Sequence, residues 1–141
     1  MTTEGTEVHG GHGEGAGKLV HEPLTRRIIG VAMDVHRELG PGLLESIYEE
    51  CLCLALQQAG HAVERQRVVP VEFRGQRVSV GLRLDIVVDE AVVIEVKSVE
   101  QLLPIHEAQL LTYLKVGSFR VGLLMNFNVV RLADGLRRLV R

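Results

Sequence analysis

The sequence predicts an α/β domain in which a mixed β-sheet is covered by helices. Three successive patterns of apolar residues along the chain predict this fold. Apolar residues first recur at helical spacing, then alternate in β-branched segments, and then return to helical spacing before a short apolar strand. The resulting order, ααβββαβ, is typical of helices packed on a mixed sheet.

The chain is long enough for one hydrophobic core. It has 141 residues, of which 46% are hydrophobic and 24% are charged, as in ordinary soluble domains. No apolar run approaches the roughly 18 residues that a membrane-spanning helix needs. Cys51 and Cys53 are the only cysteines, and on a helix their side chains point about 200° apart, which excludes a disulfide between them. We therefore expect a cytoplasmic protein without membrane contact.

Residues 1–22 are expected to form a disordered tail ahead of a single domain over residues 23–141. Six of the fifteen glycines fall in the first seventeen residues, and the segment has no apolar periodicity. His9, His12 and His21 are transition-metal ligands by type, but no rigid scaffold is expected to hold them. A metal-handling tail is therefore kept only as a third hypothesis.

Two helices are expected ahead of the strands. The first covers residues 24–39, where His36 lies on the apolar side and is expected at the edge of the core. The second covers residues 43–59 and is ended by Gly60. A Gly-Pro-Gly break at residues 40–42 separates the two helices.

A hairpin is expected next. Residues 61–73 and 77–88 alternate in hydrophobicity around a turn at residues 74–76. Pro70 cannot donate a ladder hydrogen bond, so its strand is expected at a sheet edge or with a bulge. The remaining expected elements are a strand over residues 92–98, a helix over 105–116, a strand over 120–126 and an extended segment over 129–132.

The strands around residues 89–91 place three charged side chains together. Glu95 and Lys97 are two residues apart and share one face of their strand. Asp85 joins that face only if it pairs with Glu95, which requires an odd-numbered loop such as residues 89–91. A two-residue turn would instead place Asp85 opposite Ile94 in an apolar layer, where an unpaired carboxylate costs several kcal/mol. We therefore expect the three-residue loop.

Two carboxylates and a lysine on one patch of sheet suit a divalent cation. Like charges repel, so each carboxylate is pushed towards protonation unless a cation lies between them. Oxygen ligands favour Mg²⁺ or Mn²⁺ over zinc, and a metal-bound water beside a lysine suits chemistry at phosphate. The alternative is a half-exposed strand with an ordinary Glu–Lys pair.

Two helices carry polar residues that suit the same patch. Glu45 and Tyr48 are three apart on one helix, and Gln109 and Tyr113 are four apart on another. A polar stripe on a leucine-rich helix needs polar neighbours, which the strand carboxylates would supply. Capping or surface exposure remains the alternative for each of these residues.

Together these residues resemble the motifs of the GxxExxY protein family, a branch of the PD-(D/E)XK nuclease superfamily. The resemblance covers residues 24–127, and one position differs because Leu84 stands where a proline usually precedes the aspartate. The matching residues are Gly42, Glu45 and Tyr48 for the G-x-x-E-x-x-Y motif, Asp85, Glu95 and Lys97 for the D…E-x-K motif, and Gln109 and Tyr113 for the Q-x-x-x-Y motif.

The resemblance implies an αβββαβ core with an extra N-terminal helix and an active site on one side of the sheet. It implies that Lys97 orients water or steadies the transition state, and that Gln109 and Tyr113 position substrate phosphate or the catalytic groups. The metal ligands that it implies for Mg²⁺ or Mn²⁺ are Glu45, Asp85, Glu95 and the carbonyl of Val96.

The charge distribution bears on the partner. The net charge is −2, and a chain so close to neutral is not expected to bind duplex DNA tightly by itself. Residues 84–110 hold six acids and one base, whereas residues 115–141 hold six bases and one acid. One hypothesis is a Mg²⁺-dependent nuclease acting on nucleic acid, with DNA expected, aided by a homo-oligomer, a partner protein or the Arg-rich C-terminus. The other is a non-catalytic binding or assembly module.

Overall fold

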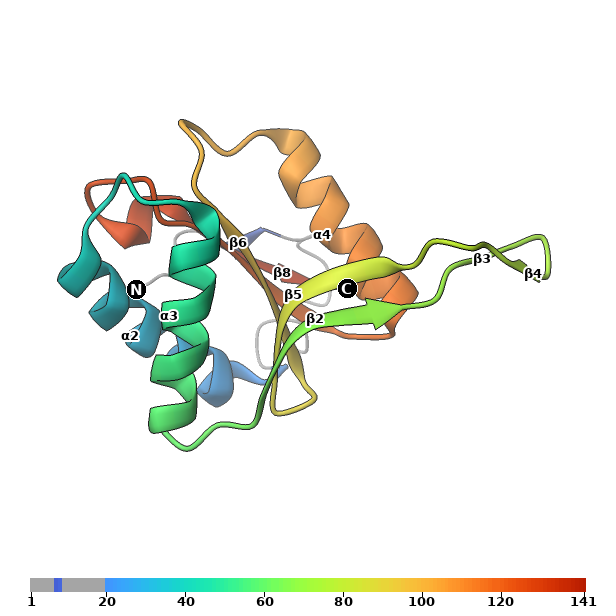
Figure 1. Cartoon of the computed structure of the whole chain (residues 1–141), viewed down its shortest axis with the longest axis horizontal. Helices are drawn as coiled ribbons and strands as arrows, with labels where there is room; N and C mark the ends of the chain where they lie inside the picture. The colour runs from blue at the N-terminus through green and yellow to red at the C-terminus, as the bar shows by residue number, and fades with distance from the viewer. Residues whose placement is uncertain (1–6, 9–19) are drawn as a thin grey trace.

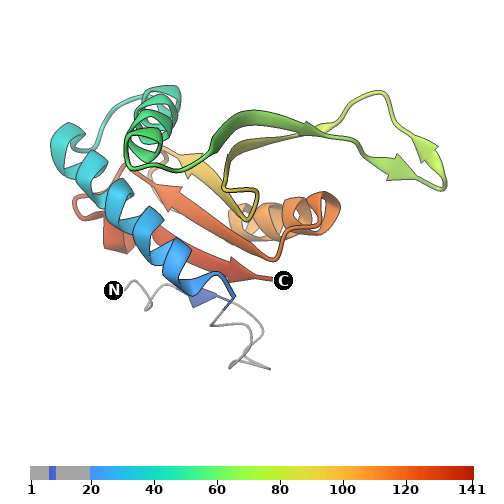
Figure 2. The same cartoon turned by 90° about the horizontal axis from the view of Figure 1, so that it is seen from below.

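A six-stranded mixed sheet runs through the centre of the molecule, with helices on both faces (Figures 1 and 2). The computed structural model describes residues 7–8 and 20–141. The sheet order is β1-β8-β7-β6-β5-β2, in which β6–β7 and β1–β8 are parallel and the other pairs antiparallel. Its strands are β1 (Glu7–Val8), β2 (Val63–Val69), β5 (Leu82–Val88), β6 (Val92–Lys97), β7 (Val121–Asn126) and β8 (Leu136–Val140). The α/β class and the mixed sheet are as the sequence predicts.

Among residues 20–141, three α-helices and one 3₁₀ helix cover the sheet. Their bounds are α2 (Glu22–Leu39), α3 (Glu45–Gln58), α4 (Pro104–Gly117) and η2 (Leu132–Gly135). Proline stands in the first turn of both α2 and α4, where its missing N–H would be unpaired in any case. Gly40 follows α2 with φ 72°, a conformation that glycine adopts without strain.

Two apolar clusters hold these layers together, one on each face of the sheet. The larger joins α2 and α3 to the sheet, and the smaller joins α4 to it. Alternation along β6 divides its side chains between them, since Ile94 and Val96 lie in the larger cluster and Val93 in the smaller. His36 is buried at the edge of the larger cluster, where its Nε2 lies 2.8 Å from the carbonyl oxygen of Val129.

The hairpin between β5 and β6 has the expected register. Val88 pairs with Val92 and Ile86 with Ile94, which leaves residues 89–91 as the three-residue loop. Asp89 and Glu90 in this loop have φ 52° and 55°. This register brings residue 85 opposite residue 95.

The two strands predicted over residues 61–73 and 77–88 are each interrupted. Between β2 and β5 the chain continues as a second, two-stranded sheet of β3 (Glu72–Phe73) and β4 (Gln76–Arg77), which projects from the body in both views (Figures 1 and 2). Pro70 falls directly after β2, which is the edge strand of the main sheet. The expected effect of this proline is therefore confirmed.

The C-terminal region differs from the prediction. Residues 129–132 do not form a strand; η2 begins at Leu132, and β8 follows it as a strand that the local pattern did not predict. Pairing with β7 fixes β8, because Val121 lies opposite Val140 and Met125 opposite Leu136. Such pairing joins segments that are apart in the sequence, so no local periodicity reveals it.

Most of the predicted N-terminal tail, residues 1–6 and 9–19, lies outside the described residues, and so do His9 and His12. Glu7–Val8 are described and pair with β8. Cys51 and Cys53 are both free, as expected. Among the described residues, none of the helices combines the length and hydrophobicity that crossing a bilayer requires.

Candidate active site

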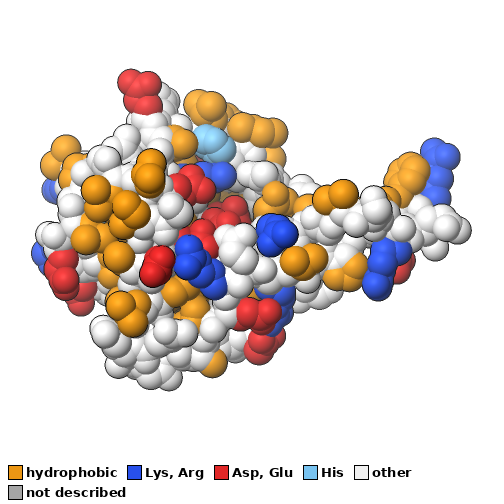
Figure 3. Space-filling model, in the orientation of Figure 1, with side chains coloured by type: hydrophobic (Ala, Val, Ile, Leu, Met, Phe, Trp, Pro, Cys, Tyr) orange, Lys and Arg blue, Asp and Glu red, His pale blue; other side chains and the backbone are white. Residues whose placement is uncertain are grey.

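Backbone hydrogen bonds fix the two strand carboxylates at the divergent end of the β5–β6 hairpin. The N–H of Val96 donates to Oδ2 of Asp85 over 2.9 Å, and the N–H of Asp85 donates to Oε1 of Glu95 over 3.3 Å. Each carboxylate thus takes a backbone bond that a regular ladder would give to a carbonyl. Figure 3 shows acidic side chains gathered in the middle of this face, over β6.

Strand β5 changes its alternation at Asp85. Leu84 and Val87 both lie in the cluster under α4, whereas Ile86 lies in the cluster under α2 and α3. Strict alternation would have put Leu84 and Ile86 on the same face. On the neighbouring strand β2, Gln66 lies at the register of Asp85. Its φ of 59° is a backbone conformation that residues other than glycine rarely adopt. The sheet is therefore distorted where it carries the central aspartate.

Gln66 links Asp85 to a buried acid on α3. Its Nε2 donates to Oε2 of Glu49 over 2.7 Å and lies 3.5 Å from Oδ1 of Asp85. Glu49 is only 5% exposed and also accepts a 2.7 Å hydrogen bond from Nε of Arg65. This support for Asp85 was not predicted from the sequence. Glu49 follows Glu45 by one helical turn, which is a usable signal, but nothing in the sequence marks Gln66.

The two carboxylates share their site at an electrostatic cost. Burial and, next, the adjacent charge of Asp85 together raise the pKa of Glu95 to about 8. Burial likewise raises the pKa of Asp85 to about 6, although the hydrogen bond from Val96 acts in the opposite direction. At neutral pH, without a bound cation, these shifts favour retention of a proton by the pair.

Lys97 and Glu45 complete the charged group. Lys97 is half-buried at the end of β6, and its charge lowers the pKa of both Asp85 and Glu95. Glu45 is exposed at the first turn of α3, and its charge raises the pKa of both strand carboxylates. Glu45 makes no hydrogen bond or ion pair within the described part of the chain, so its carboxylate is free to take a ligand.

Tyr48 holds the loop that precedes Glu45. Its side chain is fully buried; its hydroxyl donates to the carbonyl of Gly40 over 2.5 Å and accepts the N–H of Leu43 over 3.1 Å. The ring stacks on Phe127, with centroids 4.7 Å apart and planes 15° from parallel. Tyr48 therefore has a structural role, and it sets where α3 begins relative to the sheet.

The backbone beyond Lys97 is tied to the same loop and to β7. The N–H of Phe127 donates to the Lys97 carbonyl over 2.9 Å, and the Ser98 hydroxyl donates to the Leu43 carbonyl over 2.7 Å. Buried Asn126 exchanges two 3.0 Å hydrogen bonds with the backbone of Val99. Sequence reasoning missed Ser98 and Asn126, although a polar residue ending an apolar strand was a signal for the latter.

Gln109 and Tyr113 lie together on α4, but no hydrogen bond joins them to the strand carboxylates in the described structure. Nε2 of Gln109 donates to the Tyr113 hydroxyl over 2.9 Å. Both side chains are half-buried, and Tyr113 packs against the cluster under α4. Gln109 and Tyr113 lie on the α4 side of the sheet, whereas Glu45 lies at the start of α3.

The donor set suits a hard divalent cation. Glu95 is buried and Asp85 is half-buried, and a cation between the two carboxylates would remove the repulsion and burial cost that raise their pKa values. However, within residues 7–8 and 20–141 no three His, Cys, Asp or Glu side chains are grouped as a ready metal cage. Mg²⁺ keeps several water ligands and needs only one or two carboxylates, so this pair is sufficient in chemical type.

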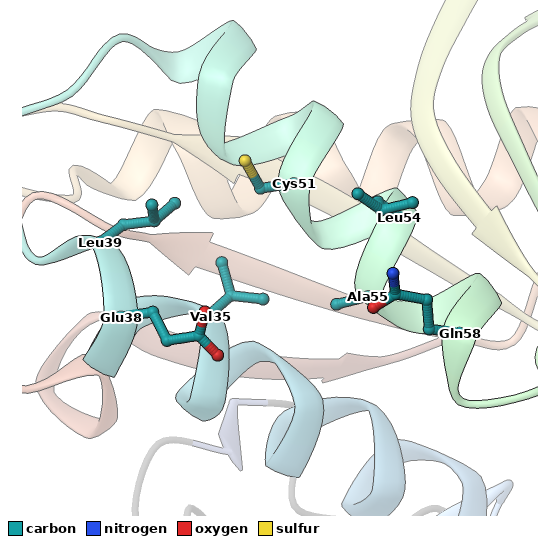
Figure 4. A pocket seen from close by; sticks show the side chains of 7 residues that line it. All are labelled: Val35, Glu38, Leu39, Cys51, Leu54, Ala55 and Gln58. Carbon is teal, nitrogen blue, oxygen red and sulfur yellow. The ribbon is translucent and has the colours of Figure 1, made fainter.

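A separate groove lies between α2 and α3, away from the charged residues. It has a volume of about 190 Å³ and is lined by Val35 and Leu39 of α2 and by Cys51, Leu54 and Ala55 of α3 (Figure 4). None of the residues that the motifs single out lines it. This groove is therefore no part of the candidate active site.

The fold and the site together define an α/β protein with an aspartate, a glutamate and a lysine at the end of a central hairpin. The model of the PD-(D/E)XK nuclease superfamily matches residues 22–139, and the chain belongs to that superfamily. Comparison with curated proteins and with solved structures gives no match.

Proposed function

We propose that this protein is a metal-dependent nuclease of the GxxExxY branch that hydrolyses phosphodiester bonds, with DNA as its substrate. The single observation that supports it best is the pair of adjacent carboxylates, buried Glu95 and half-buried Asp85, held against each other beside Lys97. A purely structural role does not account for two adjacent acids whose pKa values burial raises to about 6 and about 8.

In this proposal Asp85 and Glu95 bind Mg²⁺ or Mn²⁺, with the Val96 carbonyl and Glu45 as further ligands. The cation would supply charge stabilisation at phosphate and an activated water. Lys97 steadies the negative charge that develops on the phosphate oxygens. Gln109 and Tyr113 position the substrate phosphate from the α4 side of the sheet.

Calorimetry with Mg²⁺ and with Mn²⁺ tests the site, with nicking of plasmid DNA measured in parallel. We expect binding and metal-dependent nicking in the wild type, and loss of both in Asp85→Asn and Glu95→Gln, which keep the side-chain shape. Glu38→Gln, an exposed acid on α2, is the matched control and should behave as wild type. Nicking that survives in either site variant would assign the cutting to a contaminant.

A non-catalytic binding or assembly module is the second candidate. It is favoured by the engagement of Asp85, whose carboxylate accepts the Val96 N–H and lies beside Gln66. If metal binding and nicking are both absent from pure protein, this candidate replaces the first.

The near-neutral charge leads us to propose further that the active form is a homo-oligomer or works with a partner protein. We propose the cytoplasm as its location, since both cysteines are free thiols. Sedimentation at increasing concentration tests the first of these proposals.

A further inference from the structure

The segment between β2 and β5 projects from the body of the molecule. We define residues 70–83 as the β-arm; it comprises β3, β4 and the first two residues of β5 (Figures 1 and 2). Apolar side chains at its surface stay exposed, since Phe73 is 61% and Val80 74% accessible. A two-stranded ribbon exposed on both faces gains little stability from its own contacts, so its length is not explained by the core.

The β-arm carries three exposed arginines that form no ion pair within the described residues, although Arg77 lies opposite Glu72 in the two-stranded ladder. Arg74, Arg77 and Arg83 are all exposed and form no ion pair with any described residue, and the only acid in the β-arm is Glu72. The arginines of β2 differ, because Arg65 is bound to Glu49 and Glu50, and Arg67 to Glu64 and Glu90.

Most arginines of the C-terminal segment are also engaged in contacts within the protein. Arg137 lies 3.4 Å from Glu107, and Arg138 is buried with a hydrogen bond to Thr25. Nε of Arg141 donates to the Phe119 carbonyl over 2.8 Å. The basic segment that the sequence offered for holding DNA is therefore largely used inside the fold, which leaves the β-arm as the better-placed cationic surface.

The tip of the β-arm places an arginine where the backbone disfavours it. The turn consists of Arg74 with φ 52° and Gly75 with φ 78°, and positive φ at both positions favours Asn-Gly or Asp-Gly. Arg74 instead stands at the first position, with its guanidinium 4.9 Å from the centre of the Phe73 ring. The ring and the cation thus lie together at the tip, and both are groups that can stack on nucleic-acid bases.

We propose that the β-arm is a DNA-binding element that lies along a groove of the duplex next to the active site. A two-stranded ribbon fits the major groove, and unpaired arginines supply the phosphate contacts that the acidic site cannot. The inference rests on the proposed nuclease function, and it assigns the substrate contact of that same site.

The chain connects the two directly. Arg83 lies two residues before Asp85 on β5, and Arg77 lies eight residues before it. At about 3.3 Å for each residue of extended chain, Arg77 lies up to about 26 Å from the aspartate, a length of seven or eight base pairs. The bound DNA should therefore be covered on one side of the cleavage position only.

Binding of a 30-base-pair duplex in EDTA, followed by fluorescence anisotropy, tests the β-arm without any cutting. The arm variant is Arg74→Ala/Arg77→Ala/Arg83→Ala. Its matched control is Arg26→Ala/Arg27→Ala/Arg37→Ala on α2, which changes the net charge equally. We expect at least tenfold weaker binding by the arm variant and a salt dependence shallower by about 2 to 3 in log–log slope, since each phosphate contact contributes about 0.9. The control should bind almost as wild type.

The outcomes separate this inference from the proposed function. Equal loss in both variants, or wild-type binding by the arm variant, would overturn the arm while leaving the nuclease open to its own metal and nicking test. If only the arm variant loses DNA binding and the wild type shows no nicking, the DNA-binding role of the β-arm is supported and the nuclease function is rejected. Selective loss of self-association in sedimentation, with DNA binding unchanged, would show that the arm holds a second copy instead.

Discussion

At the scale of single residues, the site depends on how two acids share one proton and one small volume. Asp85 and Glu95 are held by backbone N–H groups. The charge of Lys97 favours their ionised forms, whereas Glu45 and, at Asp85, Glu49 oppose them. Without a cation, ionising these two carboxylates lowers the stability of the folded protein, whereas a bound cation would offset that cost. The first prediction therefore concerns the stability of the metal-free protein.

Replacing Glu95 by Gln should stabilise the metal-free protein at pH 8. The pKa of Glu95 rises from 4.5 to about 8 on folding, so between these values the unfolded chain has lost a proton that the folded chain keeps. The free energy of unfolding of the wild type therefore falls as pH rises through this window. The variant lacks this fall, and the difference should reach a few kcal/mol, at about 1.4 kcal/mol for each pKa unit.

Urea unfolding in EDTA at pH 4.5, 6 and 8 measures this difference. Glu38→Gln serves as the control, because that acid is exposed and should leave the pH dependence unchanged. A Glu95→Gln curve that is parallel to wild type across the whole pH range would show that Glu95 ionises normally in the folded protein.

A second residue-scale prediction concerns Tyr48. The Tyr48→Phe variant leaves the Gly40 carbonyl and the Leu43 N–H without their buried partner, at a cost of about 1–3 kcal/mol. Thermal unfolding measures the cost, and Tyr113→Phe, whose half-buried hydroxyl accepts only from Gln109, is the milder control. Equal melting temperatures for the two variants would contradict a clamping role for Tyr48.

At the scale of secondary-structure elements, the backbone is closely packed where η2 connects to β8. A Cβ at Gly135 would overlap the carbonyl oxygen of Asn126, whereas a Cβ at Gly30 in α2 meets nothing. Gly135→Ala should therefore destabilise the protein by more than about 2 kcal/mol, in the range of a strained core position. Gly30→Ala should instead stabilise it by about 0.5–1 kcal/mol, the helix propensity difference.

Chemical denaturation of these two variants shows whether β8 is seated against β7 as described. Both variants replace a glycine by alanine. Opposite changes in stability must therefore come from the different surroundings of the two positions. A stable Gly135→Ala protein would mean that β8 can move away from Asn126.

The elements also show how far the sequence could lead. The register of Asp85 with Glu95 followed from the cost of burying a carboxylate, which is a local argument, and it holds. Strand β8 and the support of Asp85 by Gln66 depend on contacts between distant segments. The positive φ of Gln66 occurs at the register where the neighbouring strand changes its alternation, and no local pattern in the sequence marks it.

At the scale of the whole molecule, the centre of the sheet is buried, whereas the β-arm is exposed. β6 and β7 are buried almost throughout and have paired strands on both sides, whereas β3 and β4 pair only with each other. Amides of the central strands can exchange only through global unfolding, while those of the arm need only local opening. This contrast places the adaptable part of the molecule next to Asp85.

Hydrogen exchange followed by mass spectrometry should therefore show the fastest exchange at residues 72–77 and the slowest in β6 and β7. The expected difference exceeds a thousandfold, because each 1.4 kcal/mol of opening free energy changes the exchange rate about tenfold. Protection of the arm equal to that of the central strands would mean that another surface covers it. Repeating the measurement at tenfold dilution distinguishes the sources, since a second copy would dissociate and expose the arm, whereas an intramolecular contact would not.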